Sequence, residues 1–240
     1  MATAAFKHIH VCIPCGGQMM YAATMVSLMN LFTWGVQNKI AITFEFLGQE
    51  SLLERGRSCL AARALAKGAT HLLFVDADIE FIPESVKRLL DLKRGDVKCG
   101  CYAKKNLMWD RLLKSPHASN EPLAQQLLDY NLNLVPGGKV DIEDGFACGV
   151  MHAATGFMMI SSEFLQKMTD HYKEELFVKN DIAGDSLTTY VNLFGTYIDP
   201  ERRVLLSEDY AFSDRVRAIG GEICADLIQP LGHHGLYVSS

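Results

Sequence analysis

The order of the expected strands and helices in the first part of the chain limits its fold most strongly. Short apolar runs rich in β-branched residues alternate with segments whose apolar residues recur at helical spacing. Ser51, followed three residues later by Glu54, has the spacing of a capping box at the start of one such segment. Alternation of this kind builds a parallel sheet whose strands end at one ligand-binding edge. We expect strands at 9–13, 40–47, 71–75 and 97–102, and helices at 19–34, 51–68 and 83–95.

The second half of the chain is less regular. From 104 to 149, prolines and paired glycines break up polar stretches around one helical patch at 123–128, which is typical of an insertion or a substrate loop. Because no repeat or linker divides the 240 residues, we predict one α/β domain with a mostly parallel mixed central sheet flanked by helices. Further along the chain we expect a strand at 157–160, a helix at 162–172, a helix capped by Ser207 and ended by Gly220, and a last strand at 223–228.

Composition and charge argue against several classes of protein. The formal net charge is −5 without a basic stripe, which does not suit a general nucleic-acid binder. No window holds the ~18 apolar residues that span a bilayer, and the first residues do not resemble a signal peptide. Seven cysteines, an odd number, fit a reducing compartment better than a disulfide framework, so we expect a cytoplasmic protein. The glycine-rich signatures of dinucleotide-binding and P-loop proteins are missing.

Two carboxylates follow directly after an expected buried strand. The apolar segment 72–75 leads into Asp76-Ala77-Asp78, which places both acids at the ligand edge of a parallel sheet. Two carboxylates separated by one residue can hold Mg²⁺ or Mn²⁺, and that cation would offset the charge of a leaving diphosphate. Acidic residues at a strand end can also cap the next element, so this pattern alone leaves both interpretations open.

A second pair of acids lies at the start of the last expected helix. Glu208 and Asp209 fall in its first turn, where the helix dipole favours negative charge. Helix capping alone explains that position. A carboxylate at a loop–helix junction can also act as the general base on an acceptor hydroxyl, provided that it faces the donor.

Histidines follow the last expected strand. His233 and His234 lie between two glycines, which permit close approach of the backbone. Because adjacent residues on a strand or turn point in different directions, at most one of the two can reach a cation held by Asp78. A lone histidine is more often a surface or core residue than a metal ligand.

Four cations lie close to the predicted ligand edge. Arg55 and Arg57 belong to the helix before the third strand, and Lys104 and Lys105 follow the fourth strand. Such residues could neutralise phosphates or contact an acceptor. A solvated surface charge explains each of them equally well.

Two cysteine pairs have spacings that are also found in metal and redox sites. Cys12 and Cys15 end the first strand, while Cys99 and Cys101 end the fourth, so the pairs could approach each other. With so few matching partners the spacing favours small buried hydrophobic residues over a zinc site.

In chain order, these segments resemble one family. The Pro- and Gly-containing first loop, the Arg-bearing helix, LLFVDADIEF, CGCYAKK, ATGFMMI, SEDYAF and LGHHG together resemble the GT-A nucleotide-diphospho-sugar transferases, in particular short phage, viral and bacterial members. The similarity covers roughly residues 7–237, and its specificity comes from the order of the motifs. It implies a Rossmann-like GT-A fold in which 1–103 binds the nucleotide and 104–240 binds the acceptor and carries catalysis.

The resemblance also implies roles for single residues. Asp209 would be the catalytic base of an inverting displacement, and Glu208 would support an acceptor or sugar hydroxyl. The cation, Mn²⁺ or Mg²⁺, would be held by Asp76, Asp78 and His233. The nucleotide-sugar would be bound by residues of the first loop, the Arg-bearing helix and the strand ends, namely Pro14, Cys15, Gly16, Arg57, Asp76, Ala77, Asp78, Lys104, Thr155 and Gly156.

The implied activity is that of a metal-dependent hexosyltransferase, which moves a sugar from a UDP- or GDP-linked donor to a glycan or another hydroxyl acceptor. Two alternatives stay open. A nucleotidyltransferase of related fold would use similar carboxylates, although its Gly-rich first turn with Arg and Lys is missing here. A catalytically silent module that binds nucleotide-sugars or glycans would retain the cavity without turnover.

Overall fold

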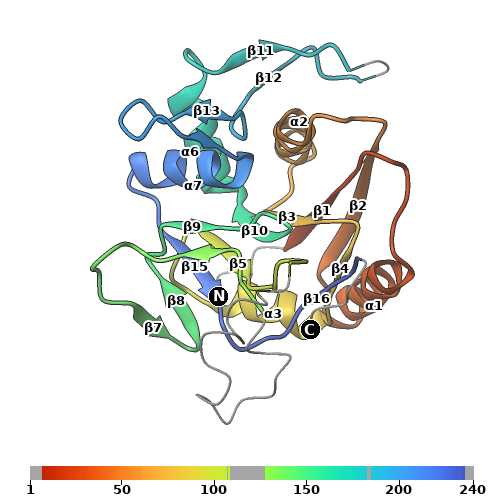
Figure 1. The fold of residues 1–240 in the computed structure, drawn as a ribbon. Helices are drawn as coiled ribbons and strands as arrows, with labels where there is room; N and C mark the ends of the chain where they lie inside the picture. Colours follow the sequence, from red (N-terminus) through yellow and green to blue (C-terminus); the bar gives the residue numbers. More distant parts are fainter. Residues whose placement is uncertain (1–6, 107, 109–127, 183–184, 236–240) are drawn as a thin grey trace, which may run out of the picture.

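The computed structural model describes residues 7–106, 108, 128–182 and 185–235. Its centre is an eight-stranded sheet with the order β2-β1-β3-β10-β5-β15-β8-β7 (Figure 1). All strands except β8 and β10 run in the same direction, so the sheet is mixed and mostly parallel, as predicted. The strands are β1 (His8–Cys15), β2 (Ala41–Gly48), β3 (His71–Val75), β5 (Val97–Gly100), β7 (Asp141–Glu143), β8 (Phe146–Cys148), β10 (Phe157–Ser161) and β15 (Ile223–Asp226).

One strand from the second half of the chain lies in the middle of the sheet. β10 is antiparallel to both β3 and β5, with Met158 opposite Phe74 on one side and Cys99 on the other. A simple series of parallel crossovers would instead place β5 beside β3. Residues 157–160 are all buried, which suits a central position. Periodicity predicts that such a strand is buried on both faces, but it does not identify the strands that it pairs with.

Helices cover both faces of the sheet (Figure 1). Alternate side chains of β3 enter the two cores, Leu72 and Phe74 on one face and Leu73 and Val75 on the other. This double burial explains why β3 is apolar without interruption. The first face is covered by α2 (Leu53–Ala66), α6 (Ser162–Tyr172) and α7 (Glu208–Ala218), and the second by α1 (Ala22–Asn38) and α3 (Pro83–Asp91).

Two small ribbons position residues beside the carboxyl edge of the sheet. β16 (Gly232–His233) pairs with β4 (Ile79–Glu80), so that His233 lies opposite Ile79, next to the Asp76-Ala77-Asp78 segment. β6 (Leu132–Asn133) pairs with β9 (His152–Ala153), which packs against α7. The described residues also form the ribbons β11 (Phe177–Lys179) with β12 (Thr189–Val191) and β13 (Tyr197–Ile198) with β14 (Leu205–Leu206).

The predicted caps of two helices are wrong in detail. α2 begins after Leu52, not Ser51, and the Leu52 N–H donates to the Glu50 carboxylate at 2.8 Å. Ser207 occupies the N-cap position of α7, but its hydroxyl donates to Asp209 Oδ1 at 2.9 Å instead of accepting a backbone N–H. At both helix starts a nearby carboxylate accepts a hydrogen bond that the serine pattern does not predict. Residues 123–127 of the predicted helical patch lie outside the described residues.

The cysteine expectation is corrected at one pair. Cys148 of β8 and Cys224 of β15 lie directly opposite each other, 4.1 Å apart at Cα, and form a disulfide. The other cysteines are free thiols, of which burial raises the pKa of Cys59 to about 11 and that of Cys101 to about 12. No helix in the described part of the chain is sufficiently long and apolar to cross a membrane.

Candidate active site

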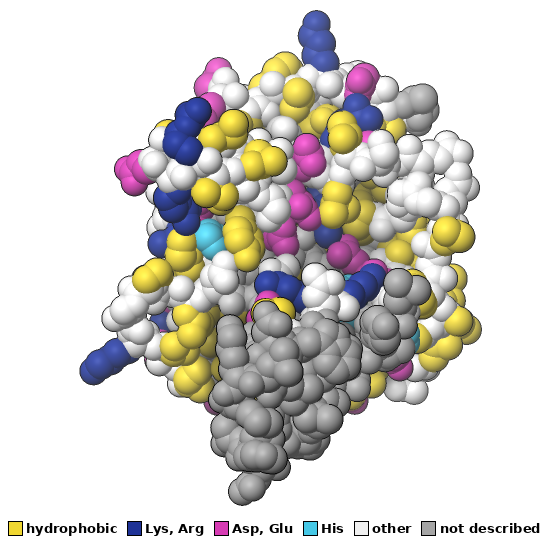
Figure 2. Space-filling model, viewed as in Figure 1, with side chains coloured by type: hydrophobic (Ala, Val, Ile, Leu, Met, Phe, Trp, Pro, Cys, Tyr) yellow, Lys and Arg dark blue, Asp and Glu magenta, His cyan; other side chains and the backbone are white. Residues whose placement is uncertain are grey.

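Charged side chains of both signs line one cavity of about 390 Å³ at the carboxyl edge of the sheet. Figure 2 shows acidic side chains gathered in the middle of this face beside Lys and Arg side chains. Two larger cavities, of about 500 Å³ and about 670 Å³, are lined mostly by apolar residues, so the charged cavity is the better candidate for chemistry. Its lining consists of Leu53, Arg57, Asp76, Asp78, Tyr102, Lys104, Lys105, Asn106, Asn131, Thr155, Glu208, Asp209 and His233.

Arg57 is a buried cation whose N–H groups are only partly used. Its side chain extends from α2, and the residue is 1% exposed. Nη2 donates to both carboxylate oxygens of Asp76, at 2.8 and 3.1 Å, while Nε and Nη1 have no hydrogen-bond partner among the described residues. Burial opposes the charge, but the carboxylates of Asp76 and Glu208 outweigh it and raise the pKa of Arg57. A buried guanidinium with unused N–H groups is suited to bind a phosphate.

Asp78 lies where three chain segments meet. Its Oδ2 accepts a hydrogen bond of 2.5 Å from Nζ of Lys105 and lies 3.7 Å from Nε2 of His233. Burial raises the pKa of Asp78, but His233 and Lys105 outweigh burial and lower it overall. The carboxylate is therefore held in the ionised state, which is the state that binds a cation.

The two adjacent histidines point in different directions. His233 donates from Nδ1 to the carbonyl oxygen of Ala103 at 2.8 Å, which leaves Nε2 facing Asp78 as a possible acceptor. The His234 ring bonds through Nε2 to Glu80 at 2.8 Å, and only its neighbour lines the cavity. The structure thus brings together the Asp78 and His233 side chains that the sequence places far apart.

The two acids at the start of α7 have different surroundings. Asp209 accepts hydrogen bonds from the Ser207 hydroxyl at 2.9 Å and from Nδ2 of Asn131 at 3.2 Å. Glu208 lies 3.8 Å from Nε of Arg57. Burial and the charge of Asp209 raise the pKa of Glu208, and the Arg57 charge offsets only part of that effect. Glu208 therefore binds a proton more readily than an ordinary glutamate, whereas Asp209 is held by two hydrogen-bond donors from neighbouring side chains.

The entry to β10 forms the rear wall of the cavity. The Gly156 N–H donates to the Tyr102 hydroxyl at 3.1 Å, and the Gly156 carbonyl accepts the Asp76 N–H at 2.8 Å. A Cβ atom at Gly156 would lie 2.3 Å from the Tyr102 hydroxyl oxygen and 2.7 Å from Asp76 Oδ2, so only glycine fits. Beside it, the Thr155 hydroxyl is buried without a hydrogen-bond partner in the described structure and faces the same cavity.

The first loop lies beside the charged cavity, not within its lining. Pro14 and Gly16 line a neighbouring cavity of about 180 Å³, and Leu53 lines both cavities. Cys15 lines the apolar cavity of about 500 Å³. Ala77 packs partly buried against the core, and its carbonyl accepts the N–H of the residue before α1. The structure therefore places only part of the predicted nucleotide-binding residues in the charged cavity, while Pro14, Cys15, Gly16 and Ala77 lie outside its lining.

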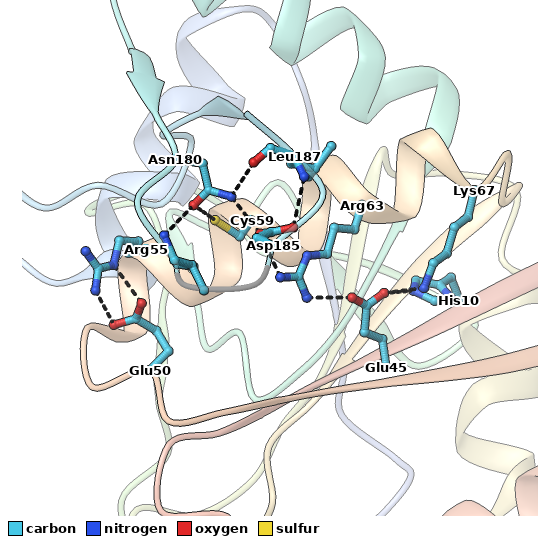
Figure 3. Close-up of polar contacts among 11 residues, drawn as sticks. His10, Glu45, Glu50, Arg55, Cys59, Arg63, Lys67, Asn180, Asp185 and Leu187 are labelled. Carbon is cyan, nitrogen blue, oxygen red and sulfur yellow. Dashed lines mark hydrogen bonds and ion pairs between the residues drawn. The ribbon is translucent and has the colours of Figure 1, made fainter. Parts of the chain in front are cut away.

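Arg55 faces away from the cavity although it lies two residues from Arg57. It forms ion pairs with Glu50 at 2.6 Å and with Asp181 at 2.9 Å, and Figure 3 shows its bond to Glu50. Helical geometry separates two residues of this spacing onto different faces. Of the two arginines considered from the sequence, the structure places only Arg57 in the site.

A second polar cluster lies along α2 outside the site (Figure 3). Arg63 bonds to Glu45 at 2.6 Å and to Asp185 at 2.7 Å, and Lys67 and His10 also contact Glu45. Burial opposes ionisation of Glu45, but these three partners lower its pKa to about 2. The charged groups of this cluster form ion pairs with one another, so the cluster is best explained as a structural contact that joins α2, β2 and the segment before β12.

Two polar lining residues, Tyr102 and Asn131, had no predicted role. Tyr102 follows β5 at the ligand edge, so its position after a strand was a usable signal. Asn131 comes from the irregular stretch 104–149, where no pattern pointed to it. Lys105 contacts Asp78, whereas Lys104, the predicted binding residue, pairs with Asp129 at 2.9 Å while still lining the cavity.

The described residues contain no group of three or more His, Cys, Asp and Glu side chains that could hold a metal ion. Both carboxylate oxygens of Asp76 accept hydrogen bonds from Arg57. Asp78 and His233, whose Oδ2 and Nε2 atoms lie 3.7 Å apart, are therefore the remaining candidates for cation ligands. Two protein ligands fit a cation that is completed by water and substrate phosphates, as is common for Mg²⁺, better than one enclosed by protein. The donor set is therefore compatible with Mg²⁺ or Mn²⁺ carried together with a diphosphate.

No family model and no curated protein matches the sequence. Among solved structures, the chain is similar to A197 from STIV, with a TM-score of 0.51 and 18% identity, covering 95% of this chain and 86% of that one. Weaker similarities include a putative glucose-1-phosphate thymidylyltransferase from Bacillus anthracis (TM-score 0.43, 10% identity, 95% and 89% covered). Another is a glycosyltransferase involved in the glycosylation of the major capsid of PBCV-1 (TM-score 0.35, 12% identity, 70% and 67% covered). The similarity to A197 concerns the fold, which is a Rossmann-like α/β fold.

Proposed function

We propose that this protein is a GT-A glycosyltransferase that moves a sugar from a UDP- or GDP-linked donor to a hydroxyl acceptor. One observation supports the proposal above all others. A single cavity combines a buried arginine with unused N–H groups, an Asp–His pair that faces one point, and two carboxyls at a helix N-terminus. A nucleotide-sugar carries the matching groups, which are a diphosphate, a cation bound to it, and a reacting carbon beside it.

The diphosphate would bind on the side of the cavity formed by α2 and β10. Arg57 Nε and Nη1 and the Thr155 hydroxyl are the unused hydrogen-bonding groups there. Asp78 and His233 would hold Mn²⁺ or Mg²⁺ against the phosphates, and that cation would stabilise the charge on the leaving diphosphate. Pro14 and Gly16 would contact the nucleoside in the adjoining cavity.

The acceptor would react on the side formed by the start of α7. Asp209 would take the proton of the acceptor hydroxyl as its oxygen forms a bond to the anomeric carbon, while the bond from that carbon to the diphosphate oxygen breaks. Asn131 and Ser207 orient the Asp209 carboxylate for this step. A single displacement by the acceptor oxygen, assisted by one base, inverts the configuration at the anomeric carbon. Glu208 would bind a hydroxyl of the sugar or acceptor.

Thermal shift with nucleotides and metals tests the proposal. We expect UDP or GDP to raise the melting temperature only in the presence of Mn²⁺ or Mg²⁺, because the cation bridges the protein and the phosphates. Asp78→Ala should abolish the metal-dependent shift together with turnover, because it removes a proposed ligand of the cation. Arg55→Met serves as the control, because its side chain lies outside the cavity, and it should keep the wild-type shift. If no combination of nucleotide and metal raises the melting temperature, the proposal is contradicted.

The products distinguish the alternatives. Incubation with a nucleotide-sugar and a hydroxyl acceptor should release a nucleoside diphosphate and form the glycosylated acceptor if the protein is a glycosyltransferase. A nucleotidyltransferase of related fold would instead release pyrophosphate from a nucleoside triphosphate and a sugar phosphate. A catalytically silent binding module would show the thermal shift without either product.

A further inference from the structure

Lys105 competes for the same carboxylate oxygen that the proposed function assigns to the cation. Its Nζ lies 2.5 Å from Asp78 Oδ2, and His233 Nε2 approaches this oxygen to 3.7 Å. Lys105 belongs to the segment after β5, whereas Asp78 precedes β4 and His233 belongs to β16. Three separate segments therefore converge on one oxygen atom.

The fold holds these segments together by direct contacts. The His233 ring bonds to the carbonyl oxygen of Ala103, two residues before Lys105, at 2.8 Å. The His234 N–H donates to the Asp78 carbonyl at 2.8 Å. A Cβ atom at Gly235 would lie 2.8 Å from Cδ of Lys105, so glycine at this position leaves room for the lysine stem. The backbone around Gly235 thus leaves space for the Lys105 side chain to reach Asp78.

A divalent cation and the Lys105 ammonium group compete for Asp78. Both are positive and repel each other, and each is stabilised by the charge of the same carboxylate. The Lys105 side chain is 38% exposed, so it has space to leave, whereas Asp78 is 24% exposed. Partly exposed ion pairs are weak enough for a divalent cation to displace the lysine.

We propose that Lys105 and the divalent cation exchange at Asp78, and this inference rests on the proposed function. When the cation is bound, the Lys105 ammonium moves from the carboxylate into the cavity, where the donor diphosphate is expected. Lys105 then acts as a positioning residue that stabilises Asp78 without the cation and neutralises phosphate with it. The exchange makes metal binding and diphosphate binding favour each other.

The first test measures Mn²⁺ binding without any nucleotide. Wild type, Lys105→Gln and Lys104→Gln are titrated with Mn²⁺, and free Mn²⁺ is followed by electron paramagnetic resonance. Removal of the competing lysine should tighten binding by about fivefold, the range expected for a partly exposed ion pair. Lys104→Gln removes the same charge one residue away, where the lysine pairs with Asp129, and should change binding clearly less. Equal effects of the two substitutions would contradict the exchange.

The second test measures the accessibility of the Lys105 amine. Modification by an amine-reactive ester, quantified by peptide mass spectrometry, should become faster when Mn²⁺ is added to wild type. In Asp78→Asn it should be fast with and without Mn²⁺, because the partner carboxylate is gone. If wild type binds Mn²⁺ but the reactivity of Lys105 does not change, the exchange is wrong while the proposed function stands. If neither wild type nor Lys105→Gln binds Mn²⁺ even when UDP or GDP is present, the metal-dependent part of the proposed function falls as well.

Discussion

At the residue scale, Glu208 and Arg57 form a loose pair in the wall of the cavity. Their charged groups lie 3.8 Å apart, too far for a direct hydrogen bond, although Arg57 has unused N–H groups. Burial and Asp209 raise the pKa of Glu208 despite this neighbouring cation. A raised pKa makes the neutral carboxyl easier to form, and in that form it can donate a hydrogen bond. The loose pairing also leaves Arg57 Nε and Nη1 without a hydrogen-bond partner among the described residues, while Nη2 bonds to Asp76.

Glu208→Gln should stabilise the protein at neutral pH. Because folding raises the pKa of Glu208, the folded state binds its proton more readily than the unfolded chain does. The stability that this proton contributes is complete at low pH and is lost as pH rises through the raised pKa. Glutamine imitates the neutral form, so the difference in the free energy of unfolding between variant and wild type should grow from acidic to neutral pH.

Urea denaturation at a series of pH values measures this difference. Glu163→Gln is the matched control, because Glu163 lies in the first turn of α6 and is exposed. That substitution removes a favourable charge from a helix N-terminus and should lower stability slightly at neutral pH. A Glu208→Gln variant that is less stable than wild type at neutral pH would show that the carboxylate is ionised and well paired.

At the scale of elements, the entry to β10 fixes the distance between the two sides of the cavity. Gly156 contacts both Tyr102, after β5, and Asp76, after β3. β10 lies between these two strands in the sheet, so a shift at its entry moves both neighbours. This central position links the packing of the sheet to the geometry of the Arg57–Asp76 pair.

Gly156→Ala should therefore destabilise the protein and weaken nucleotide binding together. The added Cβ would lie 2.3 Å from the Tyr102 oxygen and 2.7 Å from Asp76 Oδ2, and overpacking of this kind costs about 1–3 kcal/mol. Gly17→Ala is the control, because its Cβ would meet nothing closer than 3.8 Å. Melting temperature and the nucleotide-induced shift are measured for both variants. If Gly156→Ala keeps the melting temperature and the nucleotide-induced shift of wild type, the close contact of Gly156 with Tyr102 and Asp76 is contradicted.

Elements with one strong local signal were predicted well from the sequence. α6 spans the predicted residues, and β3 does so too, because its apolar run is bounded by polar residues on both sides. The central place of β10 was not predictable, since it depends on pairing between segments far apart in the chain. The N-cap residue of α7, Ser207, was predicted correctly, but its bond to Asp209 was not, and α2 begins after Leu52 instead of Ser51.

At the scale of the whole molecule, the candidate site draws on both ends of the chain. The rule that parallel strands end at one edge was sufficient to select Asp78, and the last strand led to His233. Their mutual distance, and the approach of Lys105, depend on the β4–β16 ribbon, which no sequence pattern indicated. Asn131 reaches Asp209 from an irregular stretch, where neither periodicity nor a motif marks single residues. The positions of residues at strand ends were therefore predictable, but contacts made by loops were not.

The disulfide between Cys148 and Cys224 joins the last described strand of the sheet to β8 across 76 residues of sequence. Reduction should lower the free energy of unfolding by about 2–4 kcal/mol, because the reduced unfolded chain gains conformational freedom. β15 leads from this disulfide toward His233, yet the ribbon with β4 holds the histidine separately, so nucleotide-induced stabilisation should persist after reduction.

Urea denaturation with and without reductant measures the effect, and a Cys148→Ser/Cys224→Ser double variant should be insensitive to reductant. Cys101→Ser, which removes a free thiol, should keep the wild-type response. Thiol counting in denaturant provides the direct check: five thiols should react before reduction and all seven after it. Seven reactive thiols without reductant would show that the two cysteines pack against each other unbonded, and the loss of stability on reduction should then be missing too.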